Sequence, residues 1–258
     1  LKNIAEMSGE QVANIGSQTM NHEVWLKLAA RVNEVLKGSD TVIASPDGRA
    51  ASERRLLNWL CARMPAWVTP DKLTGFGVFG AFLVFLGYTL SIWYPASLWL
   101  TFVGYAAQWF GDSMDGSLAR WRKIERPKFG YFIDHSCDGL VILLILAGMG
   151  FSHYVSLGVA LLALAGYLLL SIHAYLSARV LGELKLSYLF GGPTELRFIL
   201  IGLTLAMIWL GPEPGLFAPI SGFDIFVGTA AVILNLLFIK QTLVTARRLD
   251  LMERPPKA

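Results

Sequence analysis

The sequence predicts an all-α integral-membrane bundle of six transmembrane helices, preceded by an amphipathic helical N-terminal segment. Two observations favour this fold. Of the 258 residues, 54% are hydrophobic and only 16% are charged, whereas a soluble domain usually carries about a quarter charged residues. In addition, the apolar stretches that follow residue 71 are long enough to cross a bilayer, for which about 20 residues suffice.

The expected spans follow one another through short connections. They are placed at residues 72–93, 97–120, 129–150, 154–180, 193–211 and 222–246. The connections after the first, third and fifth spans contain no Lys or Arg, whereas basic residues collect at the other ends of the spans. The positive-inside rule therefore predicts that both termini and the basic loops are cytoplasmic.

Residues 1–66 are expected to form a separate segment ahead of a membrane domain that covers residues 67–250. Apolar residues recur at helical spacing within residues 21–38, which is typical of an amphipathic helix. Residues 50–64 place arginines beside Trp59, a composition that suits a helix at the membrane interface. A small soluble cap packed on the membrane domain is the alternative for both helices.

Four aspartates lie at the facing ends of the second and third spans. Asp112 and Asp115 are three residues apart, and Asp134 and Asp138 are four apart, so each pair shares one helix face. Four unpaired aspartates within spans would cost roughly 10 kcal/mol on insertion scales. Because clustered carboxylates repel one another, cations are expected among them. All-oxygen ligation suits Mg²⁺ or Mn²⁺, and four carboxylates can hold two such ions for phosphoryl chemistry.

Small residues near these acids leave room for a ligand. Gly116 and Ala119 lie one and two turns beyond Asp112, so a nucleotide or diphosphate could approach the backbone on that face. Arg120 stands where a guanidinium can clamp phosphate oxygens. Gly130 leaves a matching gap on the facing helix.

Read together, residues 112–138 resemble the signature of a known family. They show Asp-x-x-Asp-Gly-x-x-Ala-Arg, followed after nine residues by Gly-x-x-x-Asp-x-x-x-Asp. This pattern is similar, at every fixed position, to the motif of the CDP-alcohol phosphotransferases, also called CDP-alcohol phosphatidyltransferases. Residues 70–74 resemble the Pro-Asn-x-Leu-Thr sequence that opens the family's first span, with Asp71 in place of the usual Asn. The resemblance covers roughly residues 65–248.

The resemblance implies a membrane transferase of phospholipid synthesis that joins a CDP-linked donor to a hydroxyl acceptor, one of them a lipid, and releases CMP. Two Mg²⁺ or Mn²⁺ ions would be held by Asp112, Asp115, Asp134 and Asp138. The CDP moiety would be bound by Gly116, Ala119, Arg120 and Gly130. Asp138 would also be the catalytic base that takes the acceptor's proton. A homodimer is compatible with the family, and no nucleic-acid partner is expected.

Two local features resemble the choline/ethanolamine branch. Residues 134–138 read Asp-His-Ser-Cys-Asp, similar to that branch's Asp-His-Gly-Cys-Asp, and residues 192–195 read Gly-Pro-Thr-Glu, as they do there. We therefore expect transfer of a phospho-alcohol of the choline or ethanolamine type to a lipid hydroxyl. The alternative is phosphatidyl transfer from CDP-diacylglycerol to a small polar alcohol of the serine, glycerol phosphate or inositol type. Remoter alternatives are an intramembrane prenyltransferase and a cation transporter.

Polar residues outside the motif positions are secondary candidates. His135 would be a second base, a donor to the acceptor, or a polar residue at the interface. Glu195 and Arg197 would contact the acceptor, pair with Arg179, or lie at the interface as snorkelling or ion-paired side chains.

Overall fold

The computed structural model describes residues 48–181, 193–212 and 220–254. These residues form helices and no β-strand, which confirms the predicted all-α class. The helix expected over residues 21–38 lies outside the described residues.

The chain divides into two compact units, residues 1–56 and residues 57–258. Helix α3 (Gly48–Arg63) begins in the first unit and ends in the second. The short helix η1 (Pro95–Ser97) and all the longer helices that follow belong to the second unit. The site therefore lies within one compact unit.

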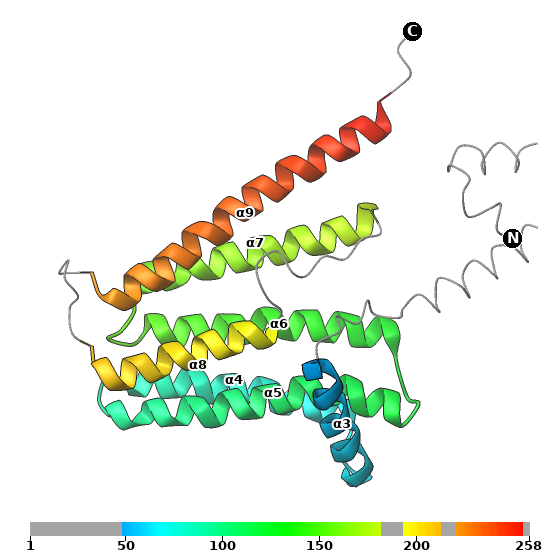
Figure 1. Cartoon of the computed structure of the whole chain (residues 1–258), viewed down its shortest axis with the longest axis horizontal. Coiled ribbons are helices and arrows are strands. Elements are labelled where there is room, and N and C mark those ends of the chain that lie inside the picture. The colour runs from blue at the N-terminus through cyan, green and yellow to red at the C-terminus, as the bar shows by residue number, and fades with distance from the viewer. Residues whose placement is uncertain (1–47, 182–192, 213–219, 255–258) are drawn as a thin grey trace, which may run out of the picture. The chain divides into compact units, whose positions relative to one another are not determined.

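The longer helices of the described chain begin within three residues of the expected span starts. They are α4 (Pro70–Leu90), α5 (Leu98–Trp121), α6 (Pro127–Gly150), α7 (Leu157–Leu181), α8 (Pro193–Leu210) and α9 (Gly222–Glu253). Helix α4 packs against α5 and α6, α6 against α7, α7 against α9, and α8 against α5 (Figure 1).

Among the described residues, helices α4, α6, α7 and α9 are long and apolar enough to cross a membrane. The apolar stretch Leu196–Leu210 of α8 is shorter. Helix α5 is 24 residues long, but its second half carries Asp112, Asp115 and Arg120, and such residues lower its hydropathy. The helices thus fit a multi-pass membrane protein, and a total of six spans stays a prediction.

Local sequence signals fix where two of these helices begin. The Thr69 hydroxyl accepts a hydrogen bond from the Lys72 backbone N–H at 3.3 Å, and Pro70 occupies the first turn of α4, where its missing N–H costs nothing. Helix α9 begins with a capping box. The Asp224 N–H donates to the Ser221 hydroxyl at 2.9 Å, and the Ser221 N–H donates to the Asp224 carboxylate at 3.2 Å.

Glycines allow α4 and α5 to approach closely. A Cβ atom at Gly80 would lie 2.7 Å from the carbonyl oxygen of Gly104, and one at Gly111 would lie 2.5 Å from that of Leu73. Both distances are shorter than real Cβ contacts, so larger residues at Gly80 and Gly111 would force the helices apart. Small residues at such positions are typical of helix pairs in membranes. The packing brings the beginning of α4 beside the aspartate-bearing half of α5.

Buried hydroxyl groups connect α8 to α4 and α5. The Tyr88 hydroxyl lies 2.7 Å from that of Thr204 and 3.1 Å from that of Tyr105, and all three side chains are almost fully buried. The Thr204 hydroxyl also donates to the Leu200 carbonyl at 2.8 Å. Because unpaired polar groups are costly in an apolar core, these contacts fix the position of α8.

The end of α3 is attached to the end of α5. Buried Cys61 packs in one apolar cluster with Met114 and Leu118 of α5, and burial raises the pKa of the Cys61 thiol. On the same side, the Arg122 guanidinium donates hydrogen bonds to the carbonyl oxygens of Met64 at 3.1 Å, Pro65 at 2.8 Å and Val68 at 2.5 Å. These bonds tie the segment that follows α3 to the end of α5.

Candidate active site

Helices α5 and α6 form a hairpin that brings the four predicted aspartates together. A short turn joins them, and Lys123 in it adopts a left-handed conformation with φ of 57°. The carboxylates of Asp112, Asp115 and Asp134 all lie close enough to interact electrostatically with that of Asp138. Two aspartate pairs, each fixed on one helix face by its spacing, therefore converge where α5 ends and α6 begins.

Asp112 is paired with an arginine from α8. Arg197 Nη2 donates to Asp112 Oδ2 at 2.7 Å, and Arg197 Nε donates to Gln108 Oε1 at 2.7 Å. The Arg197 side chain is only 13% exposed and that of Asp112 is 30% exposed, so solvent screens the pair incompletely. A charge-assisted hydrogen bond of this kind is among the stronger polar contacts in proteins.

Asp115 is oriented through both of its oxygens. The Thr74 hydroxyl of α4 donates to Asp115 Oδ2 at 2.6 Å, and the Gly116 backbone N–H donates to Asp115 Oδ1 at 2.5 Å. The two aspartates of α5 thus receive hydrogen bonds from two different neighbouring helices, α8 and α4.

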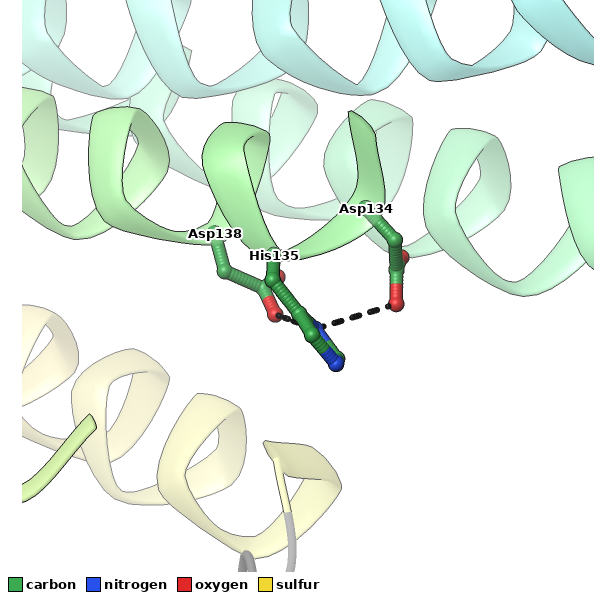
Figure 2. A group of neighbouring side chains, drawn as sticks. All are labelled: Asp134, His135 and Asp138. Carbon is green, nitrogen blue, oxygen red and sulfur yellow. Dashed lines mark ion pairs between the residues drawn. The ribbon is translucent and has the colours of Figure 1, made fainter. Parts of the chain in front are cut away.

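The aspartates of α6 flank a histidine. Figure 2 shows Asp134, His135 and Asp138 projecting from the same side of the helix. His135 Nδ1 lies 3.4 Å from Asp134 Oδ2 and 3.7 Å from Asp138 Oδ2. One ligand atom from each of the three residues can be chosen so that all lie within 4.8 Å of one another, an arrangement that could hold a metal ion.

His135 is held between aromatic rings. Its ring stacks on Tyr175 of α7 with centroids 5.0 Å apart, and its other neighbour, Tyr131, meets it edge-on at 4.2 Å. The His135 side chain is 11% exposed, and neither of its ring nitrogens has a hydrogen-bond partner among the described residues. The ring is therefore positioned by its aromatic neighbours and by the charges of Asp134 and Asp138.

The residues predicted to bind CDP adjoin the aspartates. A Cβ atom at Gly116 would lie 3.3 Å from Arg120 Nη1, so a larger side chain there would displace the guanidinium. Arg120 is exposed at the end of α5 and donates to Ser117 Oγ at 3.5 Å. Gly130 has open space where a side chain would be. Ala119 is partly buried beside them in sequence.

Reasoning from the sequence missed two contacts of this site. The sequence marks Thr74 only as part of the segment that opens the first span, and no motif or spacing marks Gln108. Arg197 forms an ion pair, which is one of the alternatives that the sequence leaves open for it, and its partner is Asp112. The side chain of Glu195 lies outside the described residues.

Most of the chain matches the model of one protein family. The model of the CDP-alcohol phosphatidyltransferases matches residues 67–241, which is most of the chain. The chain therefore belongs to the CDP-alcohol phosphatidyltransferase family, a class of membrane transferases of substituted phosphate groups that serve lipid biosynthesis.

Other similarities are more limited. Among solved structures, the chain is similar to the phosphatidylinositol phosphate synthase of Mycobacterium tuberculosis with CDP-DAG bound, with 18% identity and a TM-score of 0.49 over 73% of this chain and 92% of that one. A stretch of 40 residues is 58% identical to a probable periplasmic L-asparaginase of Haemophilus influenzae, covering 16% of this chain and 12% of that protein.

A stretch of 33 residues is 64% identical to L-asparaginase 2 of Escherichia coli, covering 13% of this chain and 10% of that protein. The chain thus spans only about a tenth of the length of these curated relatives. Their likeness is confined to a short stretch and carries no assignment of activity.

Proposed function

We propose that this chain transfers a phospho-alcohol of the choline or ethanolamine type from a CDP-alcohol to a lipid hydroxyl and releases CMP. The observation that carries the proposal is the convergence of four carboxylates on the α5–α6 hairpin, next to Arg120 and the open space at Gly130. The family membership supports the class of reaction. The Asp-His-Ser-Cys-Asp sequence of residues 134–138 supports the choice of alcohol.

The donor set fits divalent cations. The four aspartates offer hard carboxylate oxygens, which suit Mg²⁺ or Mn²⁺. Beside two of them lie the buried ring nitrogens of His135, which have no hydrogen-bond partner among the described residues. Two ions would be held by Asp112, Asp115, Asp134 and Asp138. When bound, divalent ions neutralise the charge of a diphosphate and stabilise the leaving nucleotide.

The chain's own residues would bind and orient the CDP moiety and accept the proton of the acceptor. Arg120 would pair with phosphate oxygens of the CDP moiety, while Gly116, Ala119 and Gly130 leave space for it. Asp138 would accept the proton of the acceptor hydroxyl. The hydroxyl oxygen then forms a bond to the donor's β-phosphorus, the bond between that phosphorus and the bridging oxygen breaks, and CMP leaves with the electron pair.

Charge distribution supports a cytoplasmic site. The turn between α5 and α6 and the helix ends beside it carry Arg120, Arg122, Lys123, Arg126 and Lys128. Because cytoplasmic ends of membrane helices are enriched in Lys and Arg, this end of the hairpin and both chain termini would face the cytoplasm.

The second candidate function is phosphatidyl transfer from CDP-diacylglycerol to a small polar alcohol of the serine, glycerol phosphate or inositol type. The description of the matched family, which is one of phosphatidyltransferases, favours it. Both candidate reactions release CMP and use the same residues, so they differ in which substrate is the lipid.

A product assay separates the two candidates. Purified protein in lipid nanodiscs would receive Mg²⁺ or Mn²⁺ and either CDP-choline or CDP-ethanolamine with diacylglycerol, or CDP-diacylglycerol with serine, glycerol phosphate or inositol. Mass spectrometry would identify the lipid formed, and released CMP would be quantified. A phosphatidylcholine or phosphatidylethanolamine product supports the proposal. Products only from CDP-diacylglycerol establish the second candidate, and absence of CMP from every mixture contradicts both.

Asp138→Asn tests the role of the base. We expect turnover to fall at least about 100-fold, since general-base catalysis contributes about 10²–10⁴-fold, while binding of the CDP donor stays measurable. Asp250→Asn is the matched control, because Asp250 pairs with exposed Arg254 near the end of α9, and it should keep normal turnover. Near-normal turnover in Asp138→Asn would remove Asp138 as the base.

A further inference from the structure

The hydroxyl of Thr74 reaches from α4 to an aspartate of α5. Thr74 Oγ1 lies 2.6 Å from Asp115 Oδ2 and 3.2 Å from the Pro70 carbonyl oxygen one turn earlier in its own helix. A hydroxyl has one proton to donate, and the shorter distance indicates that it goes to the carboxylate. Threonines inside helices often donate only to their own backbone, so the contact with Asp115 is a distinct feature of this one.

The close approach of the two helices places Thr74 there. Gly111 packs directly on the backbone of Leu73, which precedes Thr74. Asp115 lies one turn beyond Gly111 on the same side of α5. The glycine contact therefore sets the distance between the hydroxyl and the carboxylate, and a wider helix pair could not keep them at 2.6 Å.

The hydrogen bonds on Asp115 fix the carboxylate plane. Oδ2 accepts from the Thr74 hydroxyl and Oδ1 accepts from the Gly116 N–H at 2.5 Å. Each oxygen keeps a lone pair, because an ionised carboxylate offers about four acceptor sites. The two donors thus orient Asp115 and leave it able to bind a cation that the other aspartates share.

We propose that Thr74 is a positioning residue that holds Asp115 in the orientation needed to bind a divalent cation. This inference rests on the proposed function, since it requires the aspartate cluster to be a metal site. Groups that hydrogen-bond to metal ligands typically change metal affinity or activity by about 10–100-fold when they are removed. Thr74 acts through Asp115, so its effect should appear in cation binding before any substrate is added.

The test compares Thr74→Val, which removes the hydroxyl at nearly constant shape, with Thr74→Ser, which keeps it. Mn²⁺ binding to the purified protein without substrate would be measured by electron paramagnetic resonance. The metal concentration for half-maximal CMP release would be measured separately. Thr74→Val should weaken Mn²⁺ binding about 10-fold or more, and Thr74→Ser should stay within about twofold of the wild type, since its hydroxyl preserves the bond.

Thr229→Val is the matched control, because Thr229 is an exposed residue of α9 whose hydroxyl donates to the Ile225 carbonyl. It should bind Mn²⁺ as the wild type does. Thermal unfolding would verify that each variant is folded, and Thr74→Ala would replace Thr74→Val if the latter aggregates.

Each outcome bears on one claim. Unchanged Mn²⁺ binding in a folded variant that lacks the hydroxyl overturns the positioning role. Unchanged Mn²⁺ binding with a raised KM for the CDP donor at saturating metal also overturns it, and assigns Thr74 to the donor instead. If the wild type itself binds no Mn²⁺, the metal site of the proposed function fails, and that result is distinct from a failure of Thr74 alone.

Discussion

Replacing Arg197 by methionine should destabilise the metal-free protein and make its stability depend on added divalent cations. The variant loses the 2.7 Å bond to Asp112 and the 2.7 Å bond to Gln108, whose side chain is buried. It also removes the positive partner that Asp112 has beside the other carboxylates. A divalent cation that binds to the aspartate cluster would again neutralise the charge of Asp112.

The magnitude follows from the exposure of the pair. Both bonds are donated by the charged guanidinium, and a hydrogen bond that involves a charged group contributes about 1.5–3 kcal/mol. Because Arg197 is 13% and Asp112 is 30% exposed, screening is incomplete. We expect the free energy of unfolding of the metal-free protein to fall by about 3 kcal/mol. For a domain of this size, that lowers Tm by about 6–12 °C.

The assay is thermal unfolding in detergent, followed by intrinsic fluorescence, with EDTA and then with Mg²⁺ or Mn²⁺. The divalent cation should raise the Tm of Arg197→Met more than that of the wild type, since binding stabilises the folded state. Arg254→Met is the control, because Arg254 forms a similar pair with Asp250 that is mostly exposed. Equal Tm values for Arg197→Met and the wild type under EDTA would refute the reasoning.

Two further substitutions test how the site is supported. Gly111→Val would place a Cβ atom 2.5 Å from the Leu73 carbonyl oxygen, so we expect α4 and α5 to separate and little folded protein to be recovered by size-exclusion chromatography; a normal yield would contradict the close packing. Arg122→Ala removes all three hydrogen bonds to the carbonyls that follow α3. We expect faster proteolysis before α4 and a decrease of about 1–3 kcal/mol in the free energy of unfolding. Unchanged protection from proteolysis would show that the apolar cluster around Cys61 is enough to hold this segment in place.

Signals that depend on neighbours along the chain were readable without a structure. The hydropathy pattern places spans from residues 72 and 222, and α4 and α9 begin at Pro70 and Gly222. The spacing of Asp112 and Asp115 places both on one face of α5 because a helix repeats every 3.6 residues. The short α5–α6 connection then leaves an antiparallel hairpin as the compact arrangement of the two pairs.

Contacts between distant parts of the chain required the structure. Thr74 and Asp115 are 41 positions apart, and Arg197 and Asp112 are 85 apart. The second pair depends on the register of α8 against α5, which the buried hydroxyl of Tyr88 helps to fix. Neither periodicity nor composition encodes which turn of one helix faces which turn of another.

The sequence alone thus determined the helices, the membrane character and the convergence of four aspartates, because each follows from hydropathy or from spacing within a helix and a short turn. Only the tertiary structure decided which groups hold those aspartates. Thr74 reaches Asp115 because Gly111 lets two backbones meet, and Arg197 reaches Asp112 because α8 packs on α5. Both are consequences of side-chain packing between helices, which is set by the whole bundle and by no local segment.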